Sequence, residues 1–181
     1  SLHGLSMGGA VATLVANNTD REIAWLNLVS PGGYTHKLDQ QPARRIVGAL
    51  HRELIEELSI FLRDPSTASR VALDSLRTCR DRRMAWATEF RQLLHETVYA
   101  DLREFRANQP AAKVLLAHAS HDNLIPRTEL LQSIDLEETN GRLIDVRYAY
   151  DGGHARSGYD SQVTKEILQI ETVQPPIPDV A

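Results

Sequence analysis

A serine set among glycines is the first feature of the sequence that could do chemistry. The segment GLSMGG covers residues 4–9 and places Ser6 between Gly4 and Gly8. A serine hydroxyl is a good nucleophile only when it is held exposed, next to a base and next to donors that can bind an oxyanion. A sharp turn from a strand into a helix provides that setting, so the pattern points to nucleophilic catalysis where those two elements flank it.

The geometry of such a turn assigns roles to the neighbouring residues. Backbone strain at the serine brings together the residues two before and two after it, so we expect a Cβ to clash at both Gly4 and Gly8. Gly9 would let the following helix lie close to the sheet. Ser6 would stand at the helix amino terminus, where unpaired N–H groups favour negative charge, and the Met7 N–H is the expected oxyanion donor.

The residues after the turn are typical of a helix. Residues 10–18 read AVATLVANN, and the two asparagines are a plausible helix end. The apolar side chains recur three and four residues apart, as on one face of a helix. That expected apolar face holds Ala10, Val11, Leu14 and Val15.

Three later segments have the pattern of strands in a parallel sheet. Residues 23–29 and 113–119 form short, nearly continuous apolar runs, as in strands that helices cover on both faces. Residues 142–150 alternate apolar and polar positions, which indicates a strand nearer the sheet edge. A strand, a helix and a strand in sequence imply a right-handed parallel crossover. The expected fold class is therefore α/β.

Two more candidate groups follow these expected strands. Asp122 lies in SHDNLIP, directly after the second buried strand, at the kind of loop where open α/β sheets build their sites. His154 follows the edge strand in DGGHA, whose two glycines favour a tight turn. His118 and His121 lie three residues apart on an extended segment and therefore face opposite sides, which argues against a shared metal ion.

Together these motifs resemble those of the α/β-hydrolase family. The family's nucleophile turn is commonly written GxSMGG, and its acid commonly follows a small residue at a strand end and precedes a proline. Ala119, Asp122 and Pro126 match that layout, with Ala119 in place of the usual glycine. The serine, acid and histidine also occur in the family's order. The resemblance implies a catalytic triad of Ser6, Asp122 and His154.

The resemblance also implies a reaction. The histidine would take the serine proton during attack on a carbonyl, the aspartate would orient the imidazole, and water would hydrolyse the acyl enzyme. Serine rather than aspartate at the turn argues against the dehalogenase and epoxide hydrolase branches. Hydrolysis of a carboxylic ester is the expected activity, while an acyltransferase, a C–C bond hydrolase, a peptidase or a lyase would use the same residues. No cofactor and no metal are expected.

The resemblance divides the chain into parts. Residues 1–35 and 109–173 would form the core, the long helical stretch over 36–108 a cap or lid, and residues 174–181 a flexible tail. Ordinary crossover helices are the alternative to a cap, and the aromatic residues in this stretch are expected to pack in a core. The family has several strands before its serine turn, so we expect the C-terminal part of a mostly parallel α/β-hydrolase sheet. A catalytically silent fragment is the competing hypothesis, since the serine strand would have an open edge.

Composition limits the possible partners. The 181 residues, 42% of them apolar, can bury a sizeable core, and 20 Lys and Arg against 24 Asp and Glu give a net charge of −4. This charge offers no case for nucleic acid or an anionic membrane. Cys79 is the only cysteine, which excludes an internal disulfide and a thiolate metal site. No apolar run is long enough to span a membrane. The family resemblance implies a small acyl substrate, and a cytoplasmic location is expected. The oligomeric state stays open.

Overall fold

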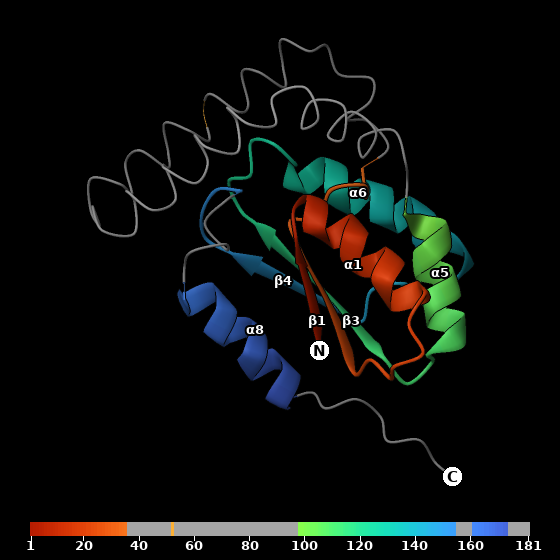
Figure 1. Ribbon diagram of the computed structural model, residues 1–181. Coiled ribbons are helices and arrows are strands. Elements are labelled where there is room, and N and C mark those ends of the chain that lie inside the picture. The colour runs from red at the N-terminus through yellow and green to blue at the C-terminus, as the bar shows by residue number, and fades with distance from the viewer. Residues whose placement is uncertain (36–51, 53–97, 155–160, 174–181) are drawn as a thin grey trace, which may run out of the picture.

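The computed structural model describes residues 1–35, 52, 98–154 and 161–173, which form a parallel sheet with helices on both faces (Figure 1). The strands are β1 (Leu2–Leu5), β2 (Trp25–Val29), β3 (Lys113–Ala119) and β4 (Val146–Tyr150). The helices are α1 (Met7–Asn17), α5 (Tyr99–Asn108), α6 (Arg127–Glu137) and α8 (Ser161–Val173), with a short 3₁₀ helix η1 (Glu138–Asn140).

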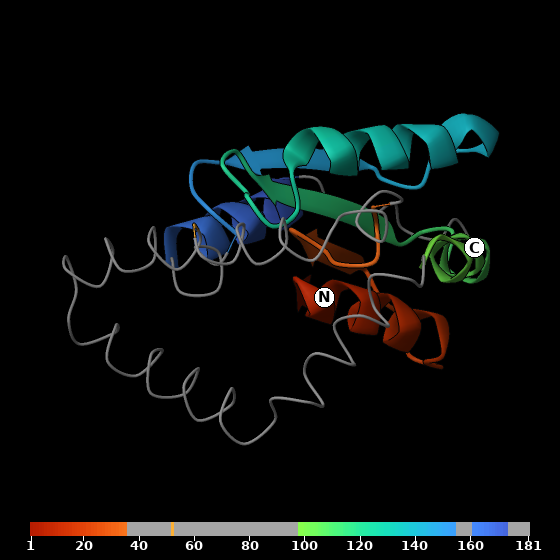
Figure 2. The ribbon, with the colours of Figure 1, turned by 90° about the horizontal axis from the view of Figure 1, so that it is seen from above.

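The described sheet has the order β1-β2-β3-β4, and every neighbouring pair is parallel. The predicted α/β fold class is therefore confirmed. Among the described strands, β1 and β4 form the two edges, and α1 and α6 lie near opposite edges when the molecule is seen from above (Figure 2). Since all four strands run in one direction, the loops that follow them meet at one end of the sheet.

Alternate residues of the buried strands enter two separate cores. In β2, Leu26 and Leu28 pack with α1, α5 and α6, whereas Trp25 and Val29 pack with α8 on the other face. Figure 1 shows these helices on the two sides of the strands. Because both faces are covered, β2 and β3 need apolar residues at nearly every position, which explains their unbroken sequence pattern.

Helix α1 packs on the sheet through small side chains. Its buried residues are Gly9, Ala10, Ala12, Thr13 and Ala16. The larger side chains are exposed, with fractions of 54% for Val11, 42% for Leu14 and 47% for Val15. The predicted apolar face of this helix is therefore wrong except at Ala10. The reason is the close approach of the start of the helix to the loop after β2: a Cβ on Gly9 would lie only 2.5 Å from the Cβ of Pro31.

Most of the segment predicted to form a cap, residues 36–51 and 53–97, lies outside the described residues, as does the tail at 174–181. Helix α5 comes from the end of the same segment. Its residues Tyr99, Leu102 and Phe105 recur at helical spacing and are buried in the core that contains α1. The core therefore includes Tyr99–Asn108, which the sequence analysis assigned to the cap, and the packing role expected for Phe105 is confirmed.

Helix α8 combines an apolar face with one polar contact to the sheet. Val163 and Ile167 are buried, and Glu171 accepts a hydrogen bond from the side-chain amide of Asn27. Asn27 is fully buried in the middle of β2, where an amide without a partner would be costly.

Over the described ranges, each helix is too short or too polar to cross a membrane.

Candidate active site

Ser6 lies between β1 and α1 in a strained conformation. Its φ of 53° and ψ of −123° fall outside the regions that non-glycine residues prefer. Backbone hydrogen bonds hold this geometry: the Ser6 N–H donates to the carbonyl of Val29 at 3.0 Å, and the Ser6 carbonyl accepts from Gly9 at 2.9 Å and Gly32 at 2.8 Å. The strain is thus held by the end of β2 and by the first turn of α1.

The two glycines flanking the serine differ in their need to be glycine. A Cβ on Gly4 would lie 2.3 Å from the carbonyl oxygen of Gly8, so a side chain at Gly4 is excluded. A Cβ on Gly8 would meet no atom of the described residues within 4 Å. The expected clash at Gly8 is therefore wrong, because the crowding in the turn acts on the strand residue and not on the helix residue.

Asp122 is held in the loop after β3 by hydrogen bonds to both carboxylate oxygens. Oδ1 accepts from the backbone N–H groups of Leu124 at 2.9 Å and Ile125 at 2.6 Å. Oδ2 lies 2.7 Å from Nδ1 of His154. The Asp122 side chain is only 2% exposed, so both its position and its partners are fixed.

His154 connects the carboxylate to the serine. Its Nε2 lies 2.8 Å from Oγ of Ser6, while its Nδ1 faces Asp122. A carboxylate can only accept, so the imidazole places its proton on Nδ1 and leaves Nε2 to accept from the serine hydroxyl. The structure thus brings the three residues singled out from the sequence into one hydrogen-bond chain.

The loops that carry Asp122 and His154 are joined because the β3–β4 pairing continues beyond the strands. Ala119 pairs with Tyr150 in the last register position. Beyond it, the Ser120 N–H donates to the carbonyl of Tyr150 at 2.9 Å, and the His121 N–H donates to that of Gly152 at 3.0 Å. The parallel ladder therefore determines how closely the carboxylate and the imidazole approach each other.

The backbone N–H of Met7 lies next to the serine at the start of α1. As the first helical residue it has no carbonyl partner within the helix, and no described side chain caps this end. A helix amino terminus also carries partial positive charge. The Met7 N–H therefore has the position and polarity of a donor to an anion formed on a substrate bound at Ser6.

The sequence analysis missed the part played by Gly32. Gly32 lies in SPGG, residues 30–33, directly after the strand predicted over 23–29, and its N–H donates to the carbonyl of the strained Ser6. A backbone donor leaves no side-chain signature, and the only available signal was a pair of glycines at the carboxyl end of a strand beside the site. Ser30, in the same segment, has a φ of 40°, a second non-glycine residue with positive φ.

Two further histidines near Asp122 have different environments. His118 is 4% exposed within β3, and the side chain of His121 is 69% exposed. Burial lowers the pKa of His118, and the positive charge of Arg127 lowers it further. No described residue is a hydrogen-bond partner for Nδ1 of His118. Both effects favour the neutral imidazole of His118, whereas His121 lies in the exposed turn after β3.

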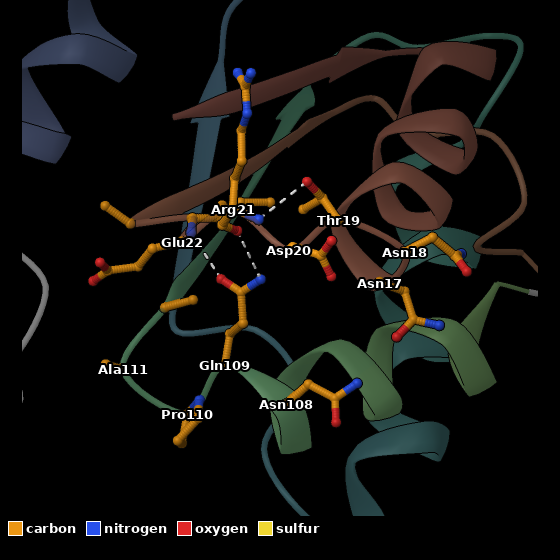
Figure 3. A pocket seen from close by; sticks show the side chains of 13 residues that line it. Asn17, Asn18, Thr19, Asp20, Arg21, Glu22, Asn108, Gln109, Pro110 and Ala111 are labelled. Atoms are coloured by element: carbon orange, nitrogen blue, oxygen red, sulfur yellow. Dashed lines mark hydrogen bonds between the residues drawn. The ribbon is translucent and has the colours of Figure 1, made fainter.

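A pocket of about 590 Å³ lies at the other end of the sheet, before β2 and β3. Figure 3 shows Gln109 extending from the end of α5 toward Arg21. The Gln109 side chain accepts from the Ile23 N–H at 2.7 Å and donates to the Arg21 carbonyl at 3.2 Å. These bonds anchor the entry to β2, and the pocket contains none of the groups that form the serine site.

Comparison with known proteins identifies the family and the fold. The sequence model of the serine aminopeptidase S33 family matches residues 1–149. No curated protein is a significant match.

Solved structures with the same fold include the enol-lactonase of Burkholderia xenovorans LB400, at 12% identity and a TM-score of 0.62, with 95% of this chain and 65% of that chain covered. A serine hydrolase of the polyaromatic-hydrocarbon-degrading bacterium Cycloclasticus zankles has 16% identity and a TM-score of 0.54, with 94% and 62% covered. A hydrolase of Pseudomonas aeruginosa PA01 has 17% identity and a TM-score of 0.53, with 95% and 64% covered.

At these identities the neighbours show the fold, and the chain spans less than two thirds of the length of each. The family model covers more than half of the chain and includes Ser6 and Asp122. The chain therefore belongs to the serine aminopeptidase S33 family and has part of the α/β-hydrolase fold.

Proposed function

We propose that the protein is a serine hydrolase that cleaves a small carboxylic ester through an acyl enzyme. One observation carries the proposal: a continuous hydrogen-bond chain runs from Asp122 through His154 to the Oγ of Ser6. A nucleophile, a base and an orienting acid at hydrogen-bonding distances are what acyl transfer by serine requires. Family membership supports the same assignment.

In the first half of the reaction, Ser6 is acylated. As Oγ attacks the ester carbonyl carbon, Nε2 of His154 takes the hydroxyl proton, and Asp122 stabilises the resulting imidazolium. The carbonyl oxygen becomes an oxyanion, to which the Met7 N–H donates. The tetrahedral intermediate then collapses, the bond to the alcohol oxygen breaks, and His154 returns the proton to the departing alkoxide.

In the second half, water removes the acyl group. His154 takes a proton from water as the water oxygen attacks the acyl carbonyl, and the Met7 N–H donates to the second oxyanion. Collapse breaks the bond to Oγ, and the imidazolium protonates the serine. The products are a carboxylic acid and an alcohol, and the enzyme returns to its starting protonation state.

Hydrolysis of a peptide bond is the second candidate, because the matching family is described as a serine aminopeptidase. The same three residues would act, with the amine in place of the alcohol as leaving group. Matched p-nitrophenyl ester and p-nitroanilide substrates with one acyl group separate the two candidates, since each releases a coloured leaving group as the same acyl enzyme forms.

Burst kinetics with p-nitrophenyl acetate test the proposal. We expect an initial burst of p-nitrophenolate that approaches one equivalent of protein, and no burst from the Ser6→Ala variant. Steady turnover that survives Ser6→Ala would contradict it. The absence of both a burst and steady turnover from the wild type would support the competing proposal, that the chain is catalytically silent because β1 forms an open edge of the described sheet.

A further inference from the structure

Ser30 lies where the ends of three strands meet, beside the proposed catalytic residues but not among them. It directly follows β2, is 1% exposed, and has a φ of 40°. Its N–H donates to the carbonyl of Ala117 in β3 at 2.7 Å. Its hydroxyl accepts from the N–H of Ala119 at 3.4 Å and lies 3.0 Å from the phenolic oxygen of Tyr150.

Those contacts lie at the strand ends from which the catalytic loops begin. Ala119 ends β3, three residues before Asp122, and Tyr150 ends β4, four residues before His154. Through Gly32, the segment that begins at Ser30 also donates to the carbonyl of Ser6. The buried Ser30 hydroxyl therefore contacts the residues from which the acid and histidine loops begin, and the loop that starts at Ser30 contacts the serine turn.

We infer that Ser30 and Tyr150 are positioning residues that hold Asp122 and His154 in register with Ser6. This inference rests on the proposed function. Neither residue touches the reacting atoms, so the effect would be transmitted through the ends of β3 and β4. A change of about 1 Å in the relative position of reacting groups can cost roughly a hundredfold in rate, so a small loss of register is enough to matter.

The chain offers a matched control for this effect. Tyr148 lies two residues before Tyr150 on the same face of β4, and their ring centroids are 6.5 Å apart. Its hydroxyl donates to Glu166 on α8, whereas the hydroxyl of Tyr150 lies next to that of Ser30. Removing the hydroxyl of Tyr148 therefore changes the same face of the same strand but leaves the contact between Ser30 and Tyr150 in place.

The test measures the rate of phosphonylation by a fluorophosphonate in Ser30→Ala, Tyr150→Phe, the double variant and Tyr148→Phe. We expect Ser30→Ala and Tyr150→Phe each to react roughly tenfold more slowly. The double variant should be no slower than Ser30→Ala, because Ser30→Ala already removes the contact that Tyr150→Phe removes. Tyr148→Phe should react within about twofold of wild type. Wild-type rates in Ser30→Ala and Tyr150→Phe, with Ser6→Ala unreactive, would overturn the inference while leaving the proposed function intact.

A second readout does not need activity. The ¹⁵N chemical shifts of the His154 ring report its tautomer and its hydrogen bond to Asp122. We expect these shifts to change in Ser30→Ala and Tyr150→Phe but not in Tyr148→Phe. If wild type does not react, the proposed function fails, and unchanged His154 shifts in the two positioning variants would then overturn this inference separately.

Discussion

Gly4 and Gly8 contact each other so closely that a methyl group on Gly4 would lie 2.3 Å from the Gly8 carbonyl oxygen. The contact couples the end of β1 to the first turn of α1 and leaves Ser6 at the apex between them. Relief of this clash would require the helix to move away from the strand, which would disrupt the hydrogen bonds that hold the Ser6 backbone.

Gly4→Ala should therefore destabilise the fold by about 3 kcal/mol, the upper end of the usual cost of overpacking. Gly8→Ala is the matched control: it lies within α1, where alanine is the better helix former, and should change stability by less than about 1 kcal/mol. Urea unfolding followed by circular dichroism measures both. Equal unfolding midpoints for Gly4→Ala and wild type would show that the turn is not crowded in this way.

Replacement of Asp122 by asparagine should abolish most of the ester hydrolysis while leaving the fold intact. The amide oxygen can still accept from Leu124 and Ile125, but the amide NH₂ would face Nδ1 of His154. That pairing favours the proton on Nε2, which then cannot accept from Ser6. We expect kcat to fall roughly 10⁴-fold, as for the same change in other serine triads.

The control for this variant is Asp151→Asn, at a carboxylate near the site that is 84% exposed and lies 3.4 Å from Nδ1 of His121. It should retain kcat within about twofold. If Asp122→Asn hydrolysed the ester as fast as Asp151→Asn, the proposed orienting role of Asp122 would be untenable.

The buried His118 should make the protein less stable in acid. Burial lowers its pKa in the folded state, so below the unfolded value of about 6.5 the unfolded chain binds a proton that the folded chain does not. The contribution of His118 to the free energy of unfolding is therefore fully present above about pH 6.5. As the pH falls from there toward the lower folded pKa, the free energy of unfolding decreases by at most about 1.4 kcal/mol per pH unit.

Urea unfolding at pH 7.5 and pH 5.5 measures this loss, which should be smaller in His118→Leu than in wild type. His121→Gln changes an exposed imidazole in the next loop and should keep the wild-type loss. A His118→Leu variant that lost as much stability as wild type between these pH values would disprove the role of His118.

Gln109 should contribute to the stability of the fold and should not affect substrate binding. Gln109→Ala would leave the N–H of Ile23 and the carbonyl of Arg21 without their side-chain partner, at a cost of roughly 1–3 kcal/mol. The change lies at the end of the sheet away from Ser6, so KM for the ester should stay within about twofold of wild type. A raised KM with unchanged stability would instead make the pocket beside Gln109 a substrate site.

The elements that could be predicted from the sequence are those with a strong apolar signal. The strand predicted over 113–119 matches β3 in both bounds, and the strand predicted over 23–29 differs from β2 only at its start. Buried parallel strands are apolar at nearly every position, so their pattern is hard to mistake. The buried face of α1 was missed because size rather than hydrophobicity selects its residues at the close approach to Pro31.

In the site, too, some features could be predicted from the sequence and others could not. Side chains with distinctive chemistry, Ser6, Asp122 and His154, could be selected from motif and order. Their approach to 2.7 and 2.8 Å depends on strand register and on backbone bonds such as that from Gly32, which have no side-chain signature. The contact between Ser30 and Tyr150 joins residues 120 positions apart and could be found only in the fold.

Mass-spectrometric mapping of a fluorophosphonate adduct tests most directly whether Ser6 and His154 act as a nucleophile and its base. We predict one adduct per chain, located on Ser6, forming roughly a hundredfold or more slowly in His154→Ala because the general base is lost. An adduct on another serine, or equal rates of Ser6 labelling in wild type and His154→Ala, would contradict the proposed site.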